Sequence, residues 1–305
     1  MTGPNPLVLC VPNFSEGRRP EVIDAICDAL SSVDGARLVY RQADPEHHRL
    51  DTTVVGPPDA VRASAFAGAS KAVELIDLSR HSGGHPRMGA ADVIPFVPLS
   101  GITMEEVVEL ARGFAKQLAE GLGIPVYLYD RASPSPERSS LAEVRKGEFE
   151  GLREAVARGE RLPDFGPHAL GPAGATAVGA RKPLVAFNVY LSGGEDDAKE
   201  IAREVRESSG GLPAVRAIGF AVPEREAVTV SMNLVDIDVT SPRAAFDAVE
   251  QLARDRGMEV RSSEIVGLVP EAALGPDDPG HVRLEGFDPD RQVVERLMSG
   301  ERSEA

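Results

Sequence analysis

The spacing of apolar residues predicts alternating strands and helices over the first 130 residues. Short continuous apolar runs, such as 7–11, are typical of strands buried on both faces. Stretches with apolar residues three and four positions apart predict amphipathic helices, and one of them begins at Pro20, a residue favoured in the first turn. We predict strands at 7–11, 37–42, 49–55, 92–97 and 124–129, and helices at 20–33, 57–78 and 103–121.

The same order of elements returns in the second part of the chain. Strands are predicted at 184–191, 214–221, 226–237 and 258–267, and helices at 196–208 and after Ser241. The repeated βαββαβ order predicts an α/β (α+β) fold of two ferredoxin-like subdomains, 1–182 and 183–305. We expect their sheets to face each other, with helices outside and the ligand in the crevice between them.

Two segments have a different composition. Residues 132–182 are rich in Pro, Ser, Gly and Arg, and within them 163–181 has four glycines and almost no periodicity, which indicates a functional loop or a boundary. The polar segment from about 276 predicts a surface tail with one short helix at 290–298.

The composition is that of a globular protein with an acidic balance. Hydrophobic residues make up 42% of the chain, which argues against wholesale disorder. The chain has 33 Lys and Arg against 48 Asp and Glu, a formal net charge of −15 that repels phosphate backbones and anionic lipid surfaces. We therefore expect no nucleic-acid or membrane partner, and an anionic ligand would need a local cluster of basic residues.

The cysteines and the N-terminus bear on location. Cys10 and Cys27 are too few for a disulfide framework, and we interpret them as buried thiols in a reducing compartment. The first six residues lack a basic region, and the apolar run that follows them is shorter than a signal-peptide core. We expect a cytoplasmic protein.

Several common chemistries are disfavoured. No GxGxxG follows a predicted strand, and the glycines of 174–179 are followed by Ala-Arg rather than Lys-Ser or Lys-Thr, so nucleotide hydrolysis is not expected. No GxSxG elbow is present. His81 and His85 have the spacing of helical zinc ligands, but the two glycines between them argue against a helix, and we predict no metal.

Polar groups gather instead in three loops, 13–19, 44–49 and 81–87. His85 is interpreted as a general acid or base, or as a loop histidine that bonds backbone groups. Arg49 and Arg87 are interpreted as carboxylate ligands or as solvated charges. The glycine-rich stretch 166–179 either approaches a planar or anionic ligand closely or links two subdomains.

Six motifs, in order, resemble one family. They are VPNFSEG at 11–17, HPRMGA at 85–90, DVIPFVP at 92–98, DFGP at 164–167, GAT at 174–176 and GAR at 179–181. From about Leu7 to Leu274 the chain resembles the formiminotransferase domain of formiminotransferase-cyclodeaminase. The resemblance implies a homodimer that transfers the formimino group of N-formimino-L-glutamate to N5 of tetrahydrofolate, in histidine degradation.

The resemblance also implies site residues. The catalytic histidine of the family precedes Pro-Arg-Met-Gly, which makes it His85 here. The folate-binding stretch corresponds to Gly166, Pro167, His168, Ala169, Leu170, Gly171, Pro172, Ala173 and Gly174. The substrate-binding residues are expected to be Arg49, Asp44, His48, Arg87 and Arg181. Tetrahydrofolate is a co-substrate in this interpretation, and no metal or redox cofactor is needed.

Two alternatives stay open at this point. One is a transferase that uses a formyl donor, for which the site residues would be nearly the same. The other is a folate-binding protein without turnover, in which His85 only bonds the pterin. No cyclodeaminase domain is expected in 305 residues, so the product would pass to a separate enzyme.

Overall fold

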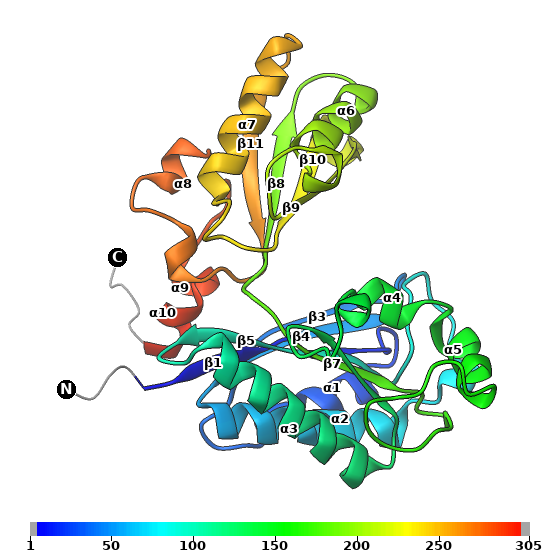
Figure 1. Cartoon of the computed structure of the whole chain (residues 1–305). Coiled ribbons are helices and arrows are strands. Elements are labelled where there is room, and N and C mark those ends of the chain that lie inside the picture. The colour runs from blue at the N-terminus through cyan, green and yellow to red at the C-terminus, as the bar shows by residue number, and fades with distance from the viewer. Residues whose placement is uncertain (1–4, 300–305) are drawn as a thin grey trace. The chain divides into compact units, whose positions relative to one another are not determined.

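Two β-sheets organise the chain, each in its own part of the sequence (Figure 1). The computed structural model describes residues 5–299. The chain divides into two units, Met1–Arg181 and Lys182–Ala305. The mixed α and β content of both units confirms the predicted fold class, and the expected facing of the two sheets stays a prediction.

The first unit contains a seven-stranded sheet, with helices α1, α2 and α3 following strands of this sheet along the chain. Its elements are β1 (Leu7–Cys10), β2 (Asn13–Phe14), α1 (Pro20–Ser31), β3 (Arg37–Asp44), β4 (Arg49–Gly56), α2 (Pro58–Leu75), the 3-10 turn η1 (Leu78–Arg80), β5 (Ala91–Ser100), α3 (Met104–Leu122), β6 (Val126–Asp130), the 3-10 turn η2 (Pro136–Arg138), α4 (Leu141–Arg145), α5 (Glu148–Ala157) and β7 (Thr176–Ala180).

Strands β1 and β2 lie at the centre of this sheet. Both pair antiparallel with β4 on one side and with β5 on the other, and β3 pairs with β4. β7 lies between β5 and β6 and is parallel to both. The register places Asn13 opposite Asp51 and Val93, so side chains from three distant segments meet at this point of the sheet.

Local sequence explains where the helices begin and end. Pro20 occupies the first turn of α1. Thr103 and Glu106 form a capping box at the start of α3, and Gly123 ends that helix with a φ of 65°. The buried faces of these helices meet fully buried core side chains, among them Phe14, Phe96 and Phe114.

The second unit has the strand order of the split βαβ fold. Its four-stranded antiparallel sheet has the order β11-β8-β10-β9. The last strand, β11, thus lies beside the first, β8, and β10 lies between β8 and β9. Its elements are β8 (Val185–Leu191), α6 (Glu195–Val205), η3 (Glu207–Ser209), β9 (Val215–Val222), η4 (Pro223–Arg225), β10 (Ala227–Leu234), α7 (Pro242–Asp255), β11 (Val260–Val266), η5 (Glu271–Ala273), α8 (Asp278–His281), α9 (Pro289–Gln292) and α10 (Val294–Ser299).

Two sequence-based interpretations need correction. The segment 132–182 is not without regular structure, because it forms α4, α5 and the fully buried strand β7. The segment after 276 is not a surface tail over the described residues, since Val282 and Val293 are buried in the core of the second unit. The predicted helix at 290–298 is split into α9 and α10. Residues 300–305 of the predicted tail lie outside the described residues.

The two cysteines are buried free thiols, as predicted. Burial raises the pKa of both thiols. Within residues 5–299, no helix combines the length and the apolar character needed to cross a bilayer.

Candidate functional site

The structure brings the three polar loops together at the centre of the first sheet. The Ser15 N–H donates to the Ala90 carbonyl at 2.9 Å, and its Oγ donates to the Gly89 carbonyl at 2.8 Å. A Cβ atom at Gly17 would lie 2.1 Å from the Asp44 carbonyl oxygen, so only glycine allows the loops 13–19 and 44–49 to approach this closely.

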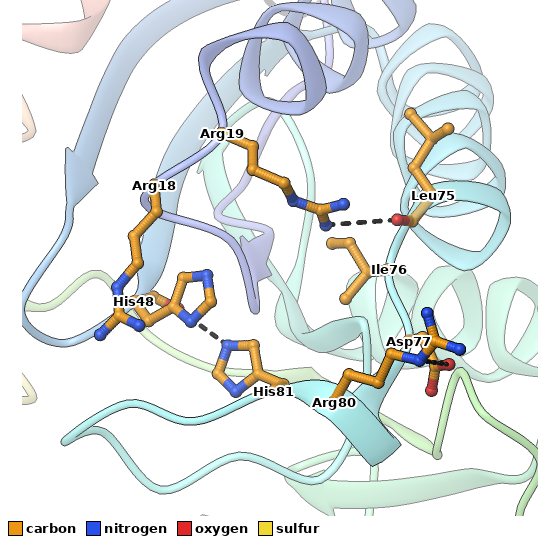
Figure 2. A pocket seen from close by; sticks show the side chains of 8 residues that line it. All are labelled: Arg18, Arg19, His48, Leu75, Ile76, Asp77, Arg80 and His81. Carbon is orange, nitrogen blue, oxygen red and sulfur yellow. Dashed lines mark hydrogen bonds and ion pairs between the residues drawn. The ribbon is translucent and has the colours of Figure 1, made fainter.

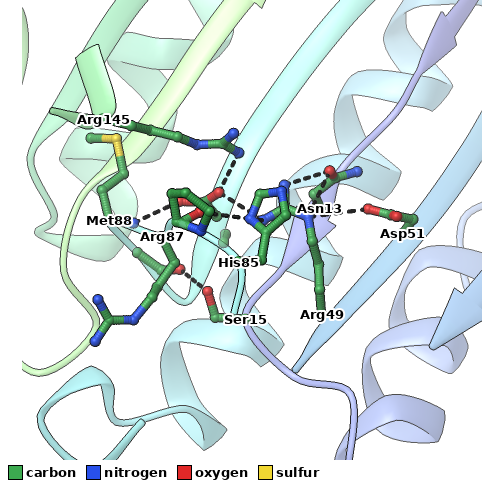
Figure 3. Close-up of polar contacts among 12 residues, drawn as sticks. Asn13, Ser15, Arg49, Asp51, His85, Arg87, Met88 and Arg145 are labelled. Atoms are coloured by element: carbon green, nitrogen blue, oxygen red, sulfur yellow. Dashed lines mark hydrogen bonds and ion pairs between the residues drawn. The ribbon is translucent and has the colours of Figure 1, made fainter. Parts of the chain in front are cut away.

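A buried ion network underlies the site (Figure 3). The Asp92 side chain is fully buried, and its Oδ2 accepts hydrogen bonds from Nη1 of Arg49 at 3.0 Å and from Nη2 of Arg145. Its Oδ1 accepts the Met88 N–H at 2.7 Å. Arg49 also donates from Nε to Oδ1 of Asn13 at 3.1 Å. Nε of Arg49 also lies 3.3 Å from Oδ1 of the more exposed Asp51, so two guanidinium groups pair with two carboxylates, of which only Asp92 is fully buried.

His85 lies beside the guanidinium group of Arg49. Its Nδ1 lies 2.7 Å from the Pro86 carbonyl oxygen and 3.1 Å from Nη1 of Arg49. Since a carbonyl only accepts and a guanidinium only donates, the shorter contact favours the tautomer with its proton on Nδ1. Nε2 then carries the lone pair, and no residue within 5–299 makes a hydrogen bond to it. Burial and the charge of Arg49 lower the pKa of His85, so the ring is a neutral base near neutral pH.

His81 is held in a structural role. Its ring stacks on His48 with centroids 4.0 Å apart, its Nδ1 accepts from Nε of Arg87 at 3.3 Å, and its Nε2 lies 3.3 Å from the His48 carbonyl oxygen. Burial lowers the pKa of His81 to about 4. Among the described residues, no group of three or more His, Cys, Asp or Glu side chains is arranged to hold a metal ion.

Glu16 is a fully buried carboxylate that the sequence analysis did not single out. Its Oε1 accepts the N–H groups of Arg18 and Arg19 at 2.8 and 3.0 Å and lies 3.1 Å from Nε2 of His48. Burial by itself would raise the pKa of Glu16, but these hydrogen bonds and the Arg19 side chain outweigh it and lower the pKa. Glu16 thus joins the loop before α1 to the loop between β3 and β4.

Arg87 and Asp44, like Arg49 and His48 above, are predicted substrate ligands that have partners inside the protein. Arg87 is buried and forms ion pairs of 2.8 Å with Glu148 and 2.7 Å with Glu150, both from α5. Asp44 accepts the N–H groups of Glu46 and His47 at 2.9 and 2.8 Å, and so shapes its own loop. Direct contact of either side chain with substrate stays a prediction.

Arg181 lies at the end of β7. Its N–H donates to the Phe96 carbonyl at 3.0 Å, next to the strand that follows the His85 loop. Its predicted contact with a substrate carboxylate is likewise not tested by this geometry.

The stretch 166–174 is tied to the segment that carries His85. The Pro172 carbonyl accepts the Leu78 N–H at 2.7 Å, and the Ala173 carbonyl accepts the Ala90 N–H at 2.8 Å. The first four residues of the stretch, Gly166 to Ala169, are exposed. The stretch therefore presents open backbone close in the fold to the loop 81–87.

Arg145 is a site residue that sequence reasoning missed. It lies on α4, is mostly buried, and its Nε is the one buried side-chain polar atom of the described residues without a hydrogen-bond partner. A five-residue helix has too few turns for a periodic signal, so nothing in the local sequence marked it.

The chain is similar to known proteins along nearly its whole length. Residues 7–181 match the family model of the formiminotransferase domain, N-terminal subdomain, and residues 186–276 match that of the formiminotransferase domain. The chain is 41% identical over 296 residues to a glutamate formimidoyltransferase of Streptococcus pyogenes serotype M1, covering 96% of this chain and 99% of that protein. It is 44% identical over 295 residues to a glutamate formimidoyltransferase of Thermoplasma acidophilum, covering 96% and 97%.

A longer relative matches over part of its length. The formimidoyltransferase-cyclodeaminase of Mus musculus is 44% identical over 275 residues, which cover 88% of this chain and 51% of that protein. These matches confirm the resemblance drawn from the six motifs. The chain belongs to the formiminotransferase family, whose two models match it over 7–181 and 186–276.

Proposed function

We propose that the protein is a glutamate formimidoyltransferase, which moves the formimino group of N-formimino-L-glutamate to N5 of tetrahydrofolate in histidine degradation. The observation that carries this proposal is the match along 96% of the chain to two relatives of that name. The placement of His85, with a free Nε2 and a depressed pKa, supports it.

The reaction needs one group that first takes and then returns a proton. N5 attacks the amidine carbon, a C–N bond forms, and the tetrahedral intermediate holds both nitrogens. N5 must lose its proton, and the glutamate nitrogen must gain one as its C–N bond breaks. Nε2 of His85 can accept the first proton and deliver it to the departing amine, a role that contributes roughly 10²- to 10⁴-fold in rate.

The buried network supports this role of His85. The Pro86 carbonyl orients the ring through Nδ1, and Arg49 keeps the ring neutral before the reaction. A neutral imidazole is the form that can act as a base. Arg49 itself is held by Asp92 and Asn13, so its charge stays at one place while the proton moves.

The substrates are assigned to the loops around His85. We place tetrahydrofolate along 166–174, whose exposed backbone allows a planar ring to approach closely. Carboxylates of the two substrates are assigned to Arg49, Arg87 and Arg181, with Asp44 and His48 as further polar contacts. The homodimer and the cytoplasmic location belong to the same proposal, and light scattering of the purified protein tests the dimer.

One experiment tests the function directly. The purified protein is incubated with tetrahydrofolate and either N-formimino-L-glutamate or N-formyl-L-glutamate, and the folate product is followed by absorbance while free glutamate is measured by chromatography. Turnover with the formimino donor supports the proposal. Turnover with the formyl donor alone would favour the formyl transferase, and folate binding without turnover on either donor would favour a binding protein.

A further inference from the structure

A second feature of the first unit is a basic pocket beside the stacked histidines (Figure 2). It has a volume of about 440 Å³, within the range of pockets that hold small molecules. It is lined by Arg18, Arg19, His48, Leu75, Ile76, Asp77, Arg80 and His81. Three guanidinium groups and one carboxylate line the pocket, and a second carboxylate, that of Glu16, pairs with Arg19.

The arginines of this pocket have donors to spare. Arg18 uses Nε on the Pro45 carbonyl at 2.8 Å, and its two terminal nitrogens make no hydrogen bond to other residues of the described chain. Arg80 is 87% exposed and meets Asp77 at 3.7 Å, too far for a strong hydrogen bond. Among the described residues Arg18 forms no ion pair and Arg80 forms only this long one, in contrast to the two short ion pairs of Arg87.

Arg19 has a different part in the pocket. Its Nε pairs with Glu16 at 2.6 Å, and its Nη2 donates to the Leu75 carbonyl at 3.3 Å, at the C-terminal end of α2. This guanidinium stabilises the negative end of the helix. The guanidinium group of Arg19 is thus used in contacts within the protein, whereas those of Arg18 and Arg80 are available to bind a ligand.

The other walls suit a short carbon chain. Leu75 is partly buried and supplies apolar surface, and Ile76, which is 4% exposed, contributes only an edge of its side chain. A ligand with carboxylates joined by two or three methylene carbons would place its charges on the arginines and its carbons on these side chains. Phosphate esters satisfy the charge but leave the apolar surface without a partner.

The pocket is connected to the His85 site through short contacts. His48 and His81 line the pocket, and on its other side His81 accepts from Nε of Arg87 in the His85 loop. His48 Nε2 also lies 3.1 Å from the buried Glu16 carboxylate. A molecule bound in the pocket therefore lies against the segment that carries the candidate base.

We propose that this pocket binds the dicarboxylate of a glutamate moiety through Arg18 and Arg80. This rests on the proposed function, in which both the formimino donor and the folate carry such a moiety. The pocket takes the glutamate moiety of one substrate, and the assignment to Arg49, Arg87 and Arg181 then applies to the other. The carboxylates accept charge-assisted hydrogen bonds from the two guanidinium groups, and the side-chain methylenes lie on Leu75 and Ile76.

The test is direct binding measured apart from turnover. Calorimetry measures the affinity of N-formimino-L-glutamate for the unmodified protein and for the double variant Arg18→Gln/Arg80→Gln. A second series measures, for the same two proteins, the affinities of 5-formyltetrahydrofolate and of the same pterin compound without glutamate. The control is Arg62→Gln, which removes one charge from α2 at a position thirteen residues before Leu75, roughly 20 Å along the helix.

We expect the double variant to weaken binding of the donor about tenfold or more, with the donor KM rising by more than kcat falls and with Arg62→Gln unchanged. If the double variant instead binds 5-formyltetrahydrofolate no more tightly than the pterin compound without glutamate, the pocket binds the glutamate moiety of the folate. Unchanged affinity for both ligands would overturn the inference. If the protein binds these ligands through Arg18 and Arg80 but shows no transferase activity, the inference about the pocket holds and the proposed function is wrong.

Discussion

Nη1 of Arg49 lies 3.1 Å from Nδ1 of His85, and the same nitrogen donates to Oδ2 of Asp92 at 3.0 Å. Arg49 thus lies between the buried carboxylate of Asp92 and the candidate base, and its positive charge, together with burial, lowers the pKa of His85. Arg145 also donates to Oδ2 of Asp92, and Nε of Arg49 lies 3.3 Å from Oδ1 of Asp51. The proton affinity of the base is therefore set by residues from β4, β5 and α4.

His85→Ala should lower kcat by roughly 10²-fold or more while folate binding is largely kept, because the substitution removes a group that acts in the transition state. His81→Ala should lower kcat much less, since His81 stacks on His48 and bonds Arg87 rather than presenting a free nitrogen. Steady-state kinetics of both variants, with and without a chelator, provide the measurement. Full activity of His85→Ala, or equal losses restored together by metal, would contradict the mechanism.

Arg145→Met should move the acid limb of the pH profile of kcat/KM to higher pH. The groups that face His85 are Arg49, Arg145, Asp92 and His47, whose ring centroid lies 6.4 Å from that of His85. Removal of one positive charge makes the protonated ring less unfavourable, so the pKa of His85 rises toward its ordinary value.

The control for that experiment is Arg158→Met, which removes the same charge at an exposed position on the surface. Its pH profile should match that of the unmodified protein. An acid limb of Arg145→Met that stays in place, in a variant that folds, would show that Arg145 does not tune the base.

Stability should fall as the pH is lowered from about 6.5 toward 4, in part because of His81. Its pKa in the folded protein is about 4, below the ordinary value, so the unfolded chain binds a proton that the folded chain does not. The free energy of unfolding is not reduced by His81 above the pKa of this histidine in the unfolded chain. It falls as the pH is lowered from that value toward the pKa of His81 in the folded protein. Denaturant unfolding of the protein and of His81→Gln at pH 7 and pH 5 measures it, and the variant should lose less stability between the two.

His168→Gln is the matched control, since His168 lies in the exposed part of 166–174. It should show the same pH dependence as the unmodified protein. If His81→Gln loses as much stability on acidification as that control, His81 is not the group responsible.

Two glycines of the stretch 166–174 should respond differently to substitution. Gly171 has no atom within 4 Å of an added Cβ, so Gly171→Val should leave thermal stability nearly unchanged and raise the folate KM by crowding the backbone. Gly174 has a φ of +70°, and its Cβ would lie 2.2 Å from the Met88 carbonyl oxygen, so Gly174→Ala should destabilise by about 1–3 kcal/mol or more.

Thermal melts and folate titrations of the two variants give the comparison. A Gly171→Val protein with unchanged folate affinity would return this stretch to the role of a linker between subdomains. A stable Gly174→Ala protein would mean that the contact between Gly174 and the His85 segment does not hold the loop in place.

The sequence by itself was sufficient for most elements and for the family. The apolar spacing predicted the helices α1, α2, α3, α6 and α7 and the strands that precede and follow them, because an amphipathic period can be recognised in consecutive residues. It missed α5, a helix of ten residues in the segment 132–182. The motif around His85 identified the candidate base in the same local way. Short elements escaped this approach, since α4 has five residues and β7 is built mainly from small, fully buried ones that show no alternation.

The tertiary structure alone decided which charges are paired. Arg87 and Arg145 are both arginines of loop-rich segments, yet one is matched by two glutamates of α5 and the other shares Asp92 with Arg49. Segments far apart in the sequence make these contacts, and a local pattern carries no information about them. The same reason explains why Val293, in a stretch that reads as a polar tail, is buried in the core of the second unit. Burial is a property of what packs against a residue, and only the folded chain determines it.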